Sequence, residues 1–179
     1  MELQLTEPNE VPLKGLSGNG LPGRPVRESA SEMSEHALPN DANSLGNLFG
    51  GKVMSLVDLA GALAAMRHAR CPVVTASVDY LNFIHPVHIG QLVILRSSVN
   101  RVYRTSMEVG VQVTVEDLLT GDRKHTCSAY LTFVAIDHNG GKVMIPPVIP
   151  ETDEEIRRFN EAGERRRIRL EMREKRRSS

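Results

Sequence analysis

The chain has 179 residues, of which 40% are hydrophobic and 25% are charged, and its 22 basic residues balance its 22 acidic residues. This length suits one domain with extensions, and the balanced charge argues against nucleic acid as a general partner. No apolar run reaches the roughly 18 residues that a membrane span needs, so we expect no membrane partner.

The chain divides into three parts by composition. Residues 1–25 hold four prolines and four glycines and too little apolar surface to pack, so we predict a flexible leader. Residues 26–139 have the composition of a folded domain, with a first strand predicted over residues 26–38. Residues 140–179 are interpreted as a linker followed by a charged C-terminal helix.

A helix is predicted over residues 51–69, and the glycine pair Gly50-Gly51 opens it. Apolar residues cover nearly every face of this helix, and a helix that is apolar all round is expected to be buried on every side. Asp58 interrupts the pattern about two turns into the helix. A carboxylate at this place in an apolar segment needs an explanation.

After Pro72 the sequence changes to strand patterns, over residues 73–83, 91–103, 107–116 and 124–137. In the third of these, valines alternate with polar residues at the period of two that places one face in the core. Short turns join the strands, which predicts an α+β fold with a curved antiparallel sheet of five or six strands wrapped round the central helix. Its free edges favour pairing with a second copy in a homodimer.

The tail from residue 151 onward carries helix signals. Thr152 followed by Glu155 resembles a capping box, and acidic residues repeatedly precede basic residues by four positions. The basic end, residues 165–177, is compatible with a nucleic-acid patch. Its interleaved glutamates favour a solvated helix instead, with contacts to ligand phosphates or to a partner subunit as further alternatives.

Two cysteines, Cys71 and Cys127, lie far apart and form neither a CxxC pair nor a metal-binding spacing. We interpret them as free thiols in a reducing compartment, with a structural disulfide as the less favoured alternative. The N-terminal segment lacks the basic start and apolar core of a secretory signal peptide. We therefore expect a cytoplasmic protein.

Asp58 is the strongest candidate for a catalytic residue. An ionised carboxylate in an apolar surround is costly, so its presence favours work as a general base or acid. The alternative is a structural aspartate that is hydrogen-bonded to Ser55, Thr75 or Ser77. The residues alone leave both interpretations open.

Asn43, Gly50 and Gly51, which precede Asp58 in the chain, strengthen the functional interpretation. Gly50 and Gly51 open the helix, where unpaired N–H groups can hold a phosphate or a developing oxyanion. Asn43 lies in the turn-forming stretch before them. Each of these signals alone also fits an ordinary turn. Taken together, a polar loop, N–H donors and an acid suggest the addition of water to a carbonyl group.

Other catalytic patterns are missing from the sequence. It contains no GxSxG nucleophile elbow, and neither cysteine has the surroundings of a nucleophile. His85 and His88 form an HxxH pair without a third ligand. We therefore expect neither a metal nor a cofactor.

The core resembles the hotdog-fold acyl-CoA thioesterases, in particular the bacterial short-chain type and the brain acyl-CoA hydrolase. The matching stretches are DANSLGNLFGGKVMSLVDLAG, VVTASVDYLNFIHPVHIGQ, RTSMEVGVQV, LLTGDRKH and AYLTFVAID, which follow in that order between residues 41 and 137. The resemblance implies hydrolysis of an acyl-CoA substrate to a free fatty acid and CoA. It also implies a hotdog dimer, commonly assembled as a trimer of dimers in a homohexamer, with active sites between subunits.

The family's catalytic residues fall on matching positions of this chain. The resemblance implies that Asp58 activates the attacking water and that Asn43 acts across the dimer interface from it. Gly50 and Gly51 take the role of oxyanion donors. Direct attack by Asp58, which would form an anhydride, is the alternative route.

The resemblance also implies a substrate channel. Its substrate-binding positions fall on Ser77, Ser106, Thr105 and Arg104, and candidates for the CoA phosphates are Arg101, Arg104 and Arg123.

Two rival functions are a non-catalytic acyl-CoA-binding module, which would lack the acid, and a dehydratase. The dehydratase would need a histidine near the helix start, and residues 43–58 contain none.

Overall fold

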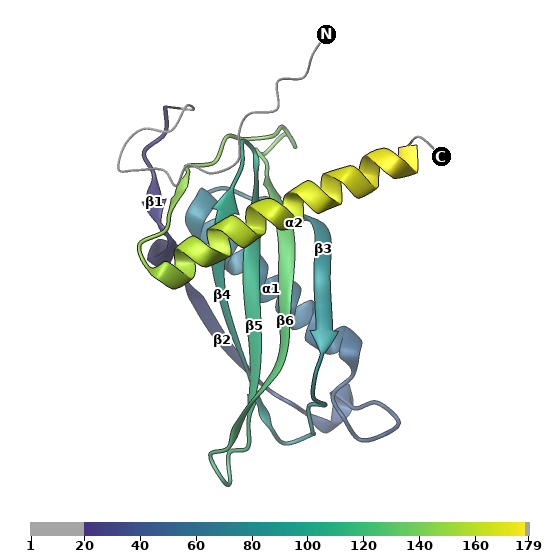
Figure 1. Ribbon diagram of the computed structural model, residues 1–179. Helices are drawn as coiled ribbons and strands as arrows, with labels where there is room; N and C mark the ends of the chain where they lie inside the picture. The colour runs from purple at the N-terminus through teal and green to yellow at the C-terminus, as the bar shows by residue number, and fades with distance from the viewer. Residues whose placement is uncertain (1–19, 178–179) are drawn as a thin grey trace.

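The computed structural model describes residues 20–177 and shows a main sheet between two helices (Figure 1). In chain order the elements are β1 (Arg24–Pro25), the 3₁₀ helix η1 (Val26–Glu28), β2 (Ser31–His36), the 3₁₀ helix η2 (Pro39–Asp41), α1 (Gly50–Ala69), β3 (Val73–Phe83), β4 (Leu92–Val102), β5 (Ser106–Glu116), β6 (Arg123–Ala135), β7 (Val148–Ile149) and α2 (Asp153–Arg177). No helix within the described range is long and apolar enough to cross a membrane.

The main sheet has five strands in the order β2-β4-β5-β6-β3, and every neighbouring pair is antiparallel. The strands predicted after the helix are all present, with ends that differ by at most two residues. The first strand is shorter than predicted, because a 3₁₀ turn precedes β2. Most of the predicted leader lies outside the described residues, but Arg24–Pro25 pair in parallel with β7.

Strands β3 and β4 are consecutive in the chain but do not pair with each other. Residues 84–91 carry the chain past β6 and β5, so β3 pairs with β6 and forms one edge of the sheet. The opposite edge is β2, which pairs with β4. Within the described part of the chain, β3 has no neighbouring strand on the side away from β6. The predicted free edge is therefore confirmed.

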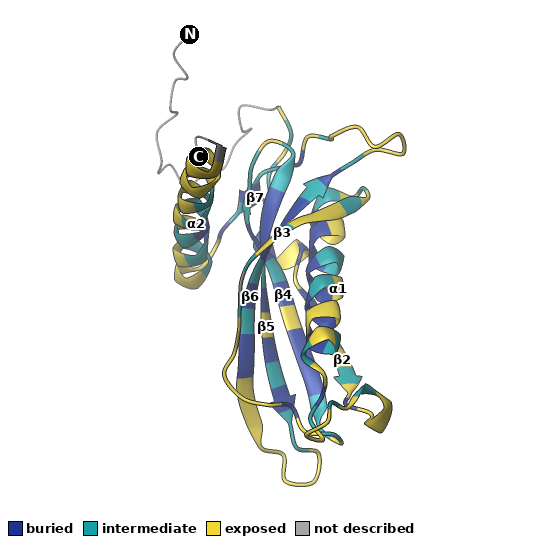
Figure 2. Cartoon of the chain, turned by 90° about the vertical axis from the view of Figure 1, so that its right-hand side faces the viewer, coloured by how far each residue is buried: buried dark blue, intermediate teal, exposed yellow. Residues whose placement is uncertain are grey.

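The apolar core lies between α1 and one face of the sheet, as predicted (Figure 2). Alternate residues of β4, β5 and β6 point toward α1, among them Leu95, Val109 and Phe133, which have no exposed surface. Helix and sheet approach closely at Gly61, where an added Cβ would lie 3.0 Å from the Phe133 ring. A glycine inside the helix thus allows the large ring to fill the space beneath it.

The prediction that the central helix is buried on every side is wrong for the single protomer. Met54, Leu59 and Met66 are 49%, 49% and 40% exposed and lie on the face of α1 turned away from the sheet. Asp58 lies on this face and is partly exposed. One sheet covers only one side of a helix, so the other side needs a further cover.

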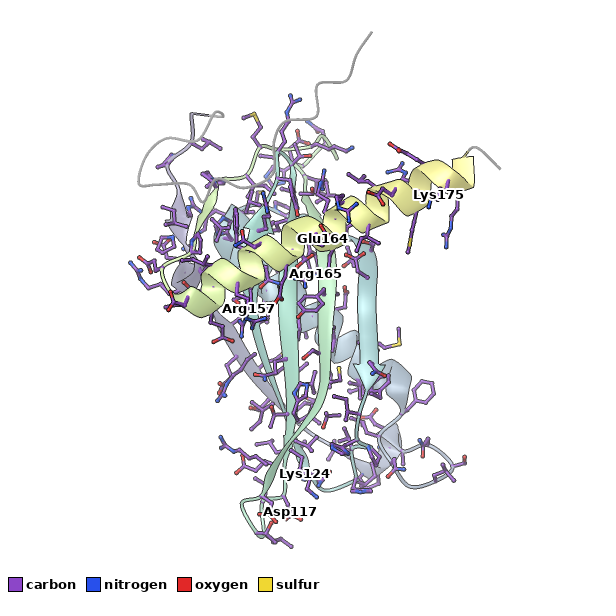
Figure 3. The ribbon with its side chains drawn as sticks, in the orientation of Figure 1. Asp117, Lys124, Arg157, Glu164, Arg165 and Lys175 are labelled. Atoms are coloured by element: carbon purple, nitrogen blue, oxygen red, sulfur yellow. The ribbon has the colours of Figure 1, made fainter. Side chains whose placement is uncertain are left out.

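The C-terminal helix lies across the outer face of the sheet, opposite α1 (Figures 1 and 2). The capping box is confirmed, because the Glu155 N–H donates to Thr152 Oγ1 and the Thr152 N–H donates to Glu155 Oε2. The prediction of a solvated helix is wrong for the side that faces the sheet. There Arg165 points to the sheet (Figure 3) and binds the fully buried Glu108 at 2.8 Å.

Candidate active site

The start of α1 presents free backbone donors. Phe49 is the N-cap residue and provides no side-chain cap, and helix geometry leaves the first N–H groups, those of Gly50 and Gly51, without partners inside the helix. A Cβ at Gly51 would lie 2.4 Å from the Phe49 ring. Glycine at position 51 therefore leaves room for the Phe49 ring beside the helix start, where the unpaired N–H groups are of the kind that holds an oxyanion or a phosphate.

Among residues 20–177, Asp58 has one side-chain partner, Thr75 of the edge strand β3. The Thr75 hydroxyl donates to Asp58 Oδ1 at 2.6 Å. From the sequence, Thr75 is expected only as one possible partner of a structural Asp58. The contact fixes one carboxylate oxygen and leaves Oδ2 on the partly exposed face of α1, which suits a base that takes a proton from bound water.

Asn43 lies in the loop before α1 and folds its side chain back on that loop. Asn43 Oδ1 accepts hydrogen bonds from the N–H groups of Leu45, at 2.9 Å, and Asn47, at 3.1 Å. Gly46 completes the turn with a φ of 76°, a conformation that glycine adopts readily. Asn43 and Asp58 make no contact within one protomer.

The predicted site residues form two separate groups in the chain. Gly50 and Asp58 are eight residues apart on one helix, which corresponds to about 12 Å along its axis. A carbonyl under attack needs its oxyanion donors and its activated water each about 3 Å away. The donors at the helix start and the carboxylate of the same protomer therefore do not serve one carbonyl.

The predicted substrate-binding residues lie away from the donors at the start of α1. Ser77 donates to Asp79 at 3.0 Å, and Asp79 pairs with Arg169 on the outer face of the sheet. Arg104 and Thr105 lie in the β4–β5 turn, and Ser106 begins β5. The Thr105 carbonyl accepts a hydrogen bond from the Ala135 N–H. Ala135 pairs with the first residue of β3, whereas Gly50 lies near its last residue, Phe83. The length of β3, about 30 Å, separates the two places.

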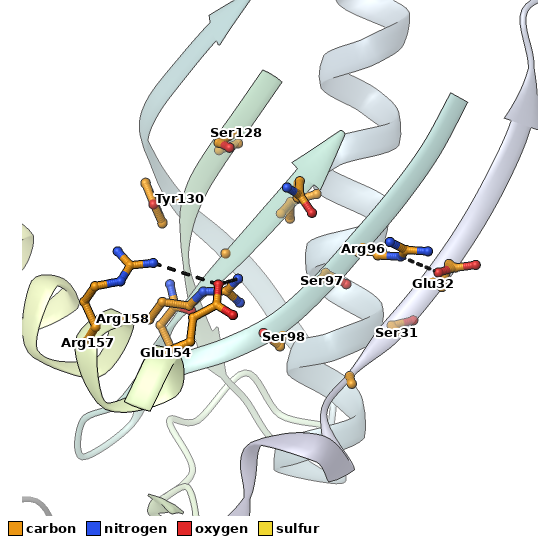
Figure 4. Close-up of a pocket in the computed structure, with 16 residues that line it drawn as sticks. Ser31, Glu32, Arg96, Ser97, Ser98, Ser128, Tyr130, Glu154, Arg157 and Arg158 are labelled. Carbon is orange, nitrogen blue, oxygen red and sulfur yellow. Dashed lines mark hydrogen bonds and ion pairs between the residues drawn. The ribbon is translucent and has the colours of Figure 1, made fainter. Parts of the chain in front are cut away.

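A hollow of about 560 Å³ lies on the outer face of the sheet, beside the first turns of α2 (Figure 4). Its charged side chains are paired with one another, Arg96 with Glu32 at 2.6 Å and Arg158 with Glu154 at 2.5 Å. None of the site residues predicted from the sequence lines it. Because α1 lies on the opposite face, this hollow is distinct from the candidate site.

Two other chemical options are disfavoured by the structure. Burial raises the pKa of the Cys127 thiol to about 11, which keeps it protonated and poorly nucleophilic near neutral pH. Within residues 20–177 no three His, Cys, Asp or Glu side chains gather as potential metal ligands. His85 and His88 also have no third ligand there.

Comparison with known proteins identifies relatives of this chain. The chain matches the thioesterase superfamily over residues 45–121. An uncharacterised acyl-CoA thioester hydrolase of Bacillus subtilis is 43% identical over 139 residues, which cover 78% of this chain and 81% of that protein. Mouse acyl-coenzyme A thioesterase 11 is also 43% identical, but this chain spans only 23% of its length.

Solved structures show the same fold. An apo-hexameric acyl-CoA thioesterase is 41% identical, with a TM-score of 0.82 over 84% of this chain and 96% of that one. An acyl-CoA hydrolase from Staphylococcus aureus, solved with butyryl-CoA, CoA and CoA disulfide, is 32% identical, with a TM-score of 0.81 over 88% of this chain and 96% of its own. Structures of the latter enzyme also exist with alanine in place of an asparagine, an aspartate and a threonine.

Proposed function

The chain belongs to the thioesterase superfamily, and from this premise we propose that it is an acyl-CoA hydrolase, which converts an acyl-CoA and water to a free carboxylic acid and CoA. The relatives described above support this activity, because they are named acyl-CoA thioester hydrolases or thioesterases. The rival function is a non-catalytic acyl-CoA-binding module. Such a module has no use for a carboxylate like Asp58 that is held by the Thr75 hydroxyl, so this pair favours the hydrolase.

The observation that carries the proposed mechanism is the separation of about 12 Å along α1 between Gly50 and Asp58. We assign Asn43 and the N–H groups of Gly50 and Gly51 to a first half-site, and Asp58 with its partner Thr75 to a second. They lie too far apart in one protomer to act on one carbonyl. We assign each active site to the first half-site of one protomer and the second half-site of its partner.

The Staphylococcus aureus enzyme supports this choice of residues. Its three alanine variants replace, in chain order, an asparagine, an aspartate and a threonine that are separated by 15 and then 17 positions. Asn43, Asp58 and Thr75 have the same types, order and separations here. The spacing thus adds Thr75, which the sequence analysis did not assign to the site.

The reaction follows from the roles of these groups. The thioester oxygen accepts hydrogen bonds from the helix N–H groups, which stabilise the negative charge of the tetrahedral intermediate. Asp58 removes a proton from water as its oxygen bonds to the carbonyl carbon, while Thr75 holds the other carboxylate oxygen. The carbon–sulfur bond then breaks, and the CoA sulfur leaves with the proton that Asp58 took.

The free edge of β3 and the exposed face of α1 provide the dimer surface. On β3, Val74 and Val78 are 45% and 47% exposed, and on the open face of α1 Met54, Leu59 and Met66 are exposed as well. A second copy that pairs along β3 would cover this surface and supply strand partners. Because solved relatives are hexameric, we extend the proposal to a trimer of such dimers.

We place the enzyme in the cytoplasm and assign it no cofactor. Cys71 and Cys127 are free thiols, as expected in a reducing compartment. The proposed chemistry uses only a carboxylate, hydroxyl and N–H groups with water. It therefore has no step that requires a metal or an electron carrier.

Mixing two impaired variants tests activity and site division together. CoA release is measured on acyl-CoAs from acetyl to palmitoyl with wild type, Asn43→Ala, Asp58→Ala and a refolded equimolar mixture of both variants. Each variant alone is expected to keep only a small, measurable residual activity, and the mixture should recover about a quarter of wild-type activity, because half of the dimers contain one intact site. If verified mixed dimers recover no activity, the whole site lies within one chain. If the wild type binds acyl-CoA but does not hydrolyse it, the protein is a ligand-binding module.

A further inference from the structure

A histidine ties the loop before α1 to the segment before β4. His88 Nδ1 lies 2.8 Å from Asn47 Oδ1, and the His88 N–H donates to Gln91 Oε1 at 2.8 Å. Asn47 and His88 also form an antiparallel bridge, and the Leu48 N–H donates to the Val87 carbonyl at 2.8 Å. Because a carboxamide oxygen only accepts hydrogen bonds, the proton in the His88–Asn47 contact belongs to His88 Nδ1.

Asn47 in turn holds Asn43. The Asn43 N–H donates to the Asn47 carbonyl at 2.7 Å, and the Asn47 N–H donates to Asn43 Oδ1 at 3.1 Å. Since Leu45 N–H also donates to Oδ1, both acceptor positions of this oxygen are used inside the loop. The Nδ2 group of Asn43 has no acceptor among residues 20–177, so it is the part of the side chain available to a substrate.

We propose that His88 is a positioning residue for thioester hydrolysis, which acts through Asn47 to fix Asn43 so that Asn43 Nδ2 donates to the thioester carbonyl oxygen. This inference rests on the function proposed above, in which Asn43 contacts the reacting group. A donor fixed at the developing oxyanion needs no reorganisation during the reaction. A displacement of about 1 Å at such a position can lower a rate about a hundredfold.

The variant series compares His88 with its neighbour. His88→Leu is expected to lower kcat on the order of tenfold and to leave KM within about twofold, because a misplaced donor affects the transition state more than substrate binding. His88→Asn should recover most of the rate, since its Nδ2 can occupy the position of the histidine Nδ1. His85 is exposed and makes no hydrogen bond within the described range, so His85→Leu is the matched control and should behave as wild type.

The Asn43→Ala background separates positioning from general structural support. There His88→Leu is expected to cause no further loss, because no carboxamide is left to position. Equal losses of kcat in both backgrounds would overturn the proposal. Asn43→Asp is a second arm: it keeps Oδ1 for the loop but removes the donor, so it should be as impaired as Asn43→Ala, and wild-type turnover would refute the donor role.

The outcomes distinguish this inference from the proposed function. If Asn43→Ala turns over like wild type, the role proposed for Asn43 fails, and the inference about His88 fails with it. If Asn43→Ala is impaired and His88→Leu has wild-type kcat, only the inference about His88 is refuted.

Discussion

His68, at the residue scale, is a fully buried histidine that joins the end of α1 to the segment before β7. Its Nε2 donates to the Pro146 carbonyl at 2.8 Å, and its Nδ1 has no hydrogen-bond partner in the described part of the chain. Burial lowers the pKa of His68 below its ordinary value of 6.5, because an imidazolium would lose its hydration there. The hydrogen bond to the Pro146 carbonyl opposes this effect, but burial is the larger cause.

Stability is therefore expected to fall as the pH drops below about 6.5. Between that value and the lower pKa of the folded state, the unfolded chain binds a proton that the folded chain does not. The free energy of unfolding then falls by at most about 1.4 kcal/mol per pH unit, and the loss ends below the folded pKa. Urea unfolding of wild type and His68→Gln between pH 5 and 7.5 measures this. Glutamine can keep the donor without titrating, so its curve should be flatter, and equal slopes would contradict the argument.

The candidate site could be predicted only as a set of residue types. Asp58 was identified because a carboxylate contradicts its apolar surroundings in the sequence. Its contact with Thr75 crosses 17 positions and depends on how β3 lies beside α1. Asn43 looked like an ordinary turn former, and in the structure its Oδ1 does form a turn. The turn and the proposed donor use different atoms of the Asn43 side chain, which sequence patterns do not separate.

The two helices show what patterns predict at the scale of an element. The bounds of α1 agree with the prediction to within one residue, because its helix formers and glycine start are local features. The cover of its second face could not be predicted, since an apolar face looks the same whether it meets a core or a second protomer. The same limit applies to the charged side chains of α2. Arg165 pairs with Glu108, which is 57 residues away in the chain, and the pattern of α2 alone does not indicate this partner.

The ion pair between Arg165 and Glu108 docks α2 on the sheet. Glu108 has no exposed surface, and besides Arg165 it accepts a hydrogen bond from Asn100 at 3.1 Å. The Arg165 guanidinium also lies 3.7 Å from the centre of the Tyr130 ring. Arg165→Met would leave a buried carboxylate without its cation and should lower the free energy of unfolding by about 3 kcal/mol.

Urea unfolding compares that variant with two controls. Arg167 pairs with Glu164 and Glu171 on the exposed side of α2, so Arg167→Met should leave the urea midpoint nearly unchanged. Adding Glu108→Leu to Arg165→Met removes the uncompensated charge and should recover most of the loss. Similar midpoints for Arg165→Met and Arg167→Met would show that the buried pair does not dock the helix.

At the scale of the whole molecule, the order of the strands could not be predicted. Alternation and short turns indicate antiparallel neighbours, and β4, β5 and β6 follow that rule. Nothing in residues 84–91 indicates that the chain passes two strands before it re-enters the sheet. That crossing leaves β3 at the edge, and so determines which surface a second copy can meet.

The end of α2 extends toward that surface. Arg169 pairs with Asp79 on the edge strand, and the following turns continue past β3 (Figure 1). Leu170 and Met172, in these turns, are 42% and 58% exposed. If a second copy pairs along β3, as proposed, the last turns of α2 lie over its sheet and bury these side chains.

Deleting residues 170–179 should therefore weaken the dimer while the Arg169–Asp79 pair keeps the rest of α2 in place. We expect the dimer dissociation constant to rise on the order of tenfold, which corresponds to about 1.4 kcal/mol. Sedimentation equilibrium measures it, and specific activity at low protein concentration should fall in parallel, because in the proposed arrangement each active site needs two chains. Leu119→Ser is the matched control, since Leu119 is 98% exposed in the β5–β6 turn, away from β3. If the deletion variant has the same dimer dissociation constant as the Leu119→Ser control, the end of α2 makes no contact with the partner. If the wild type is monomeric at every concentration, the dimer itself is refuted.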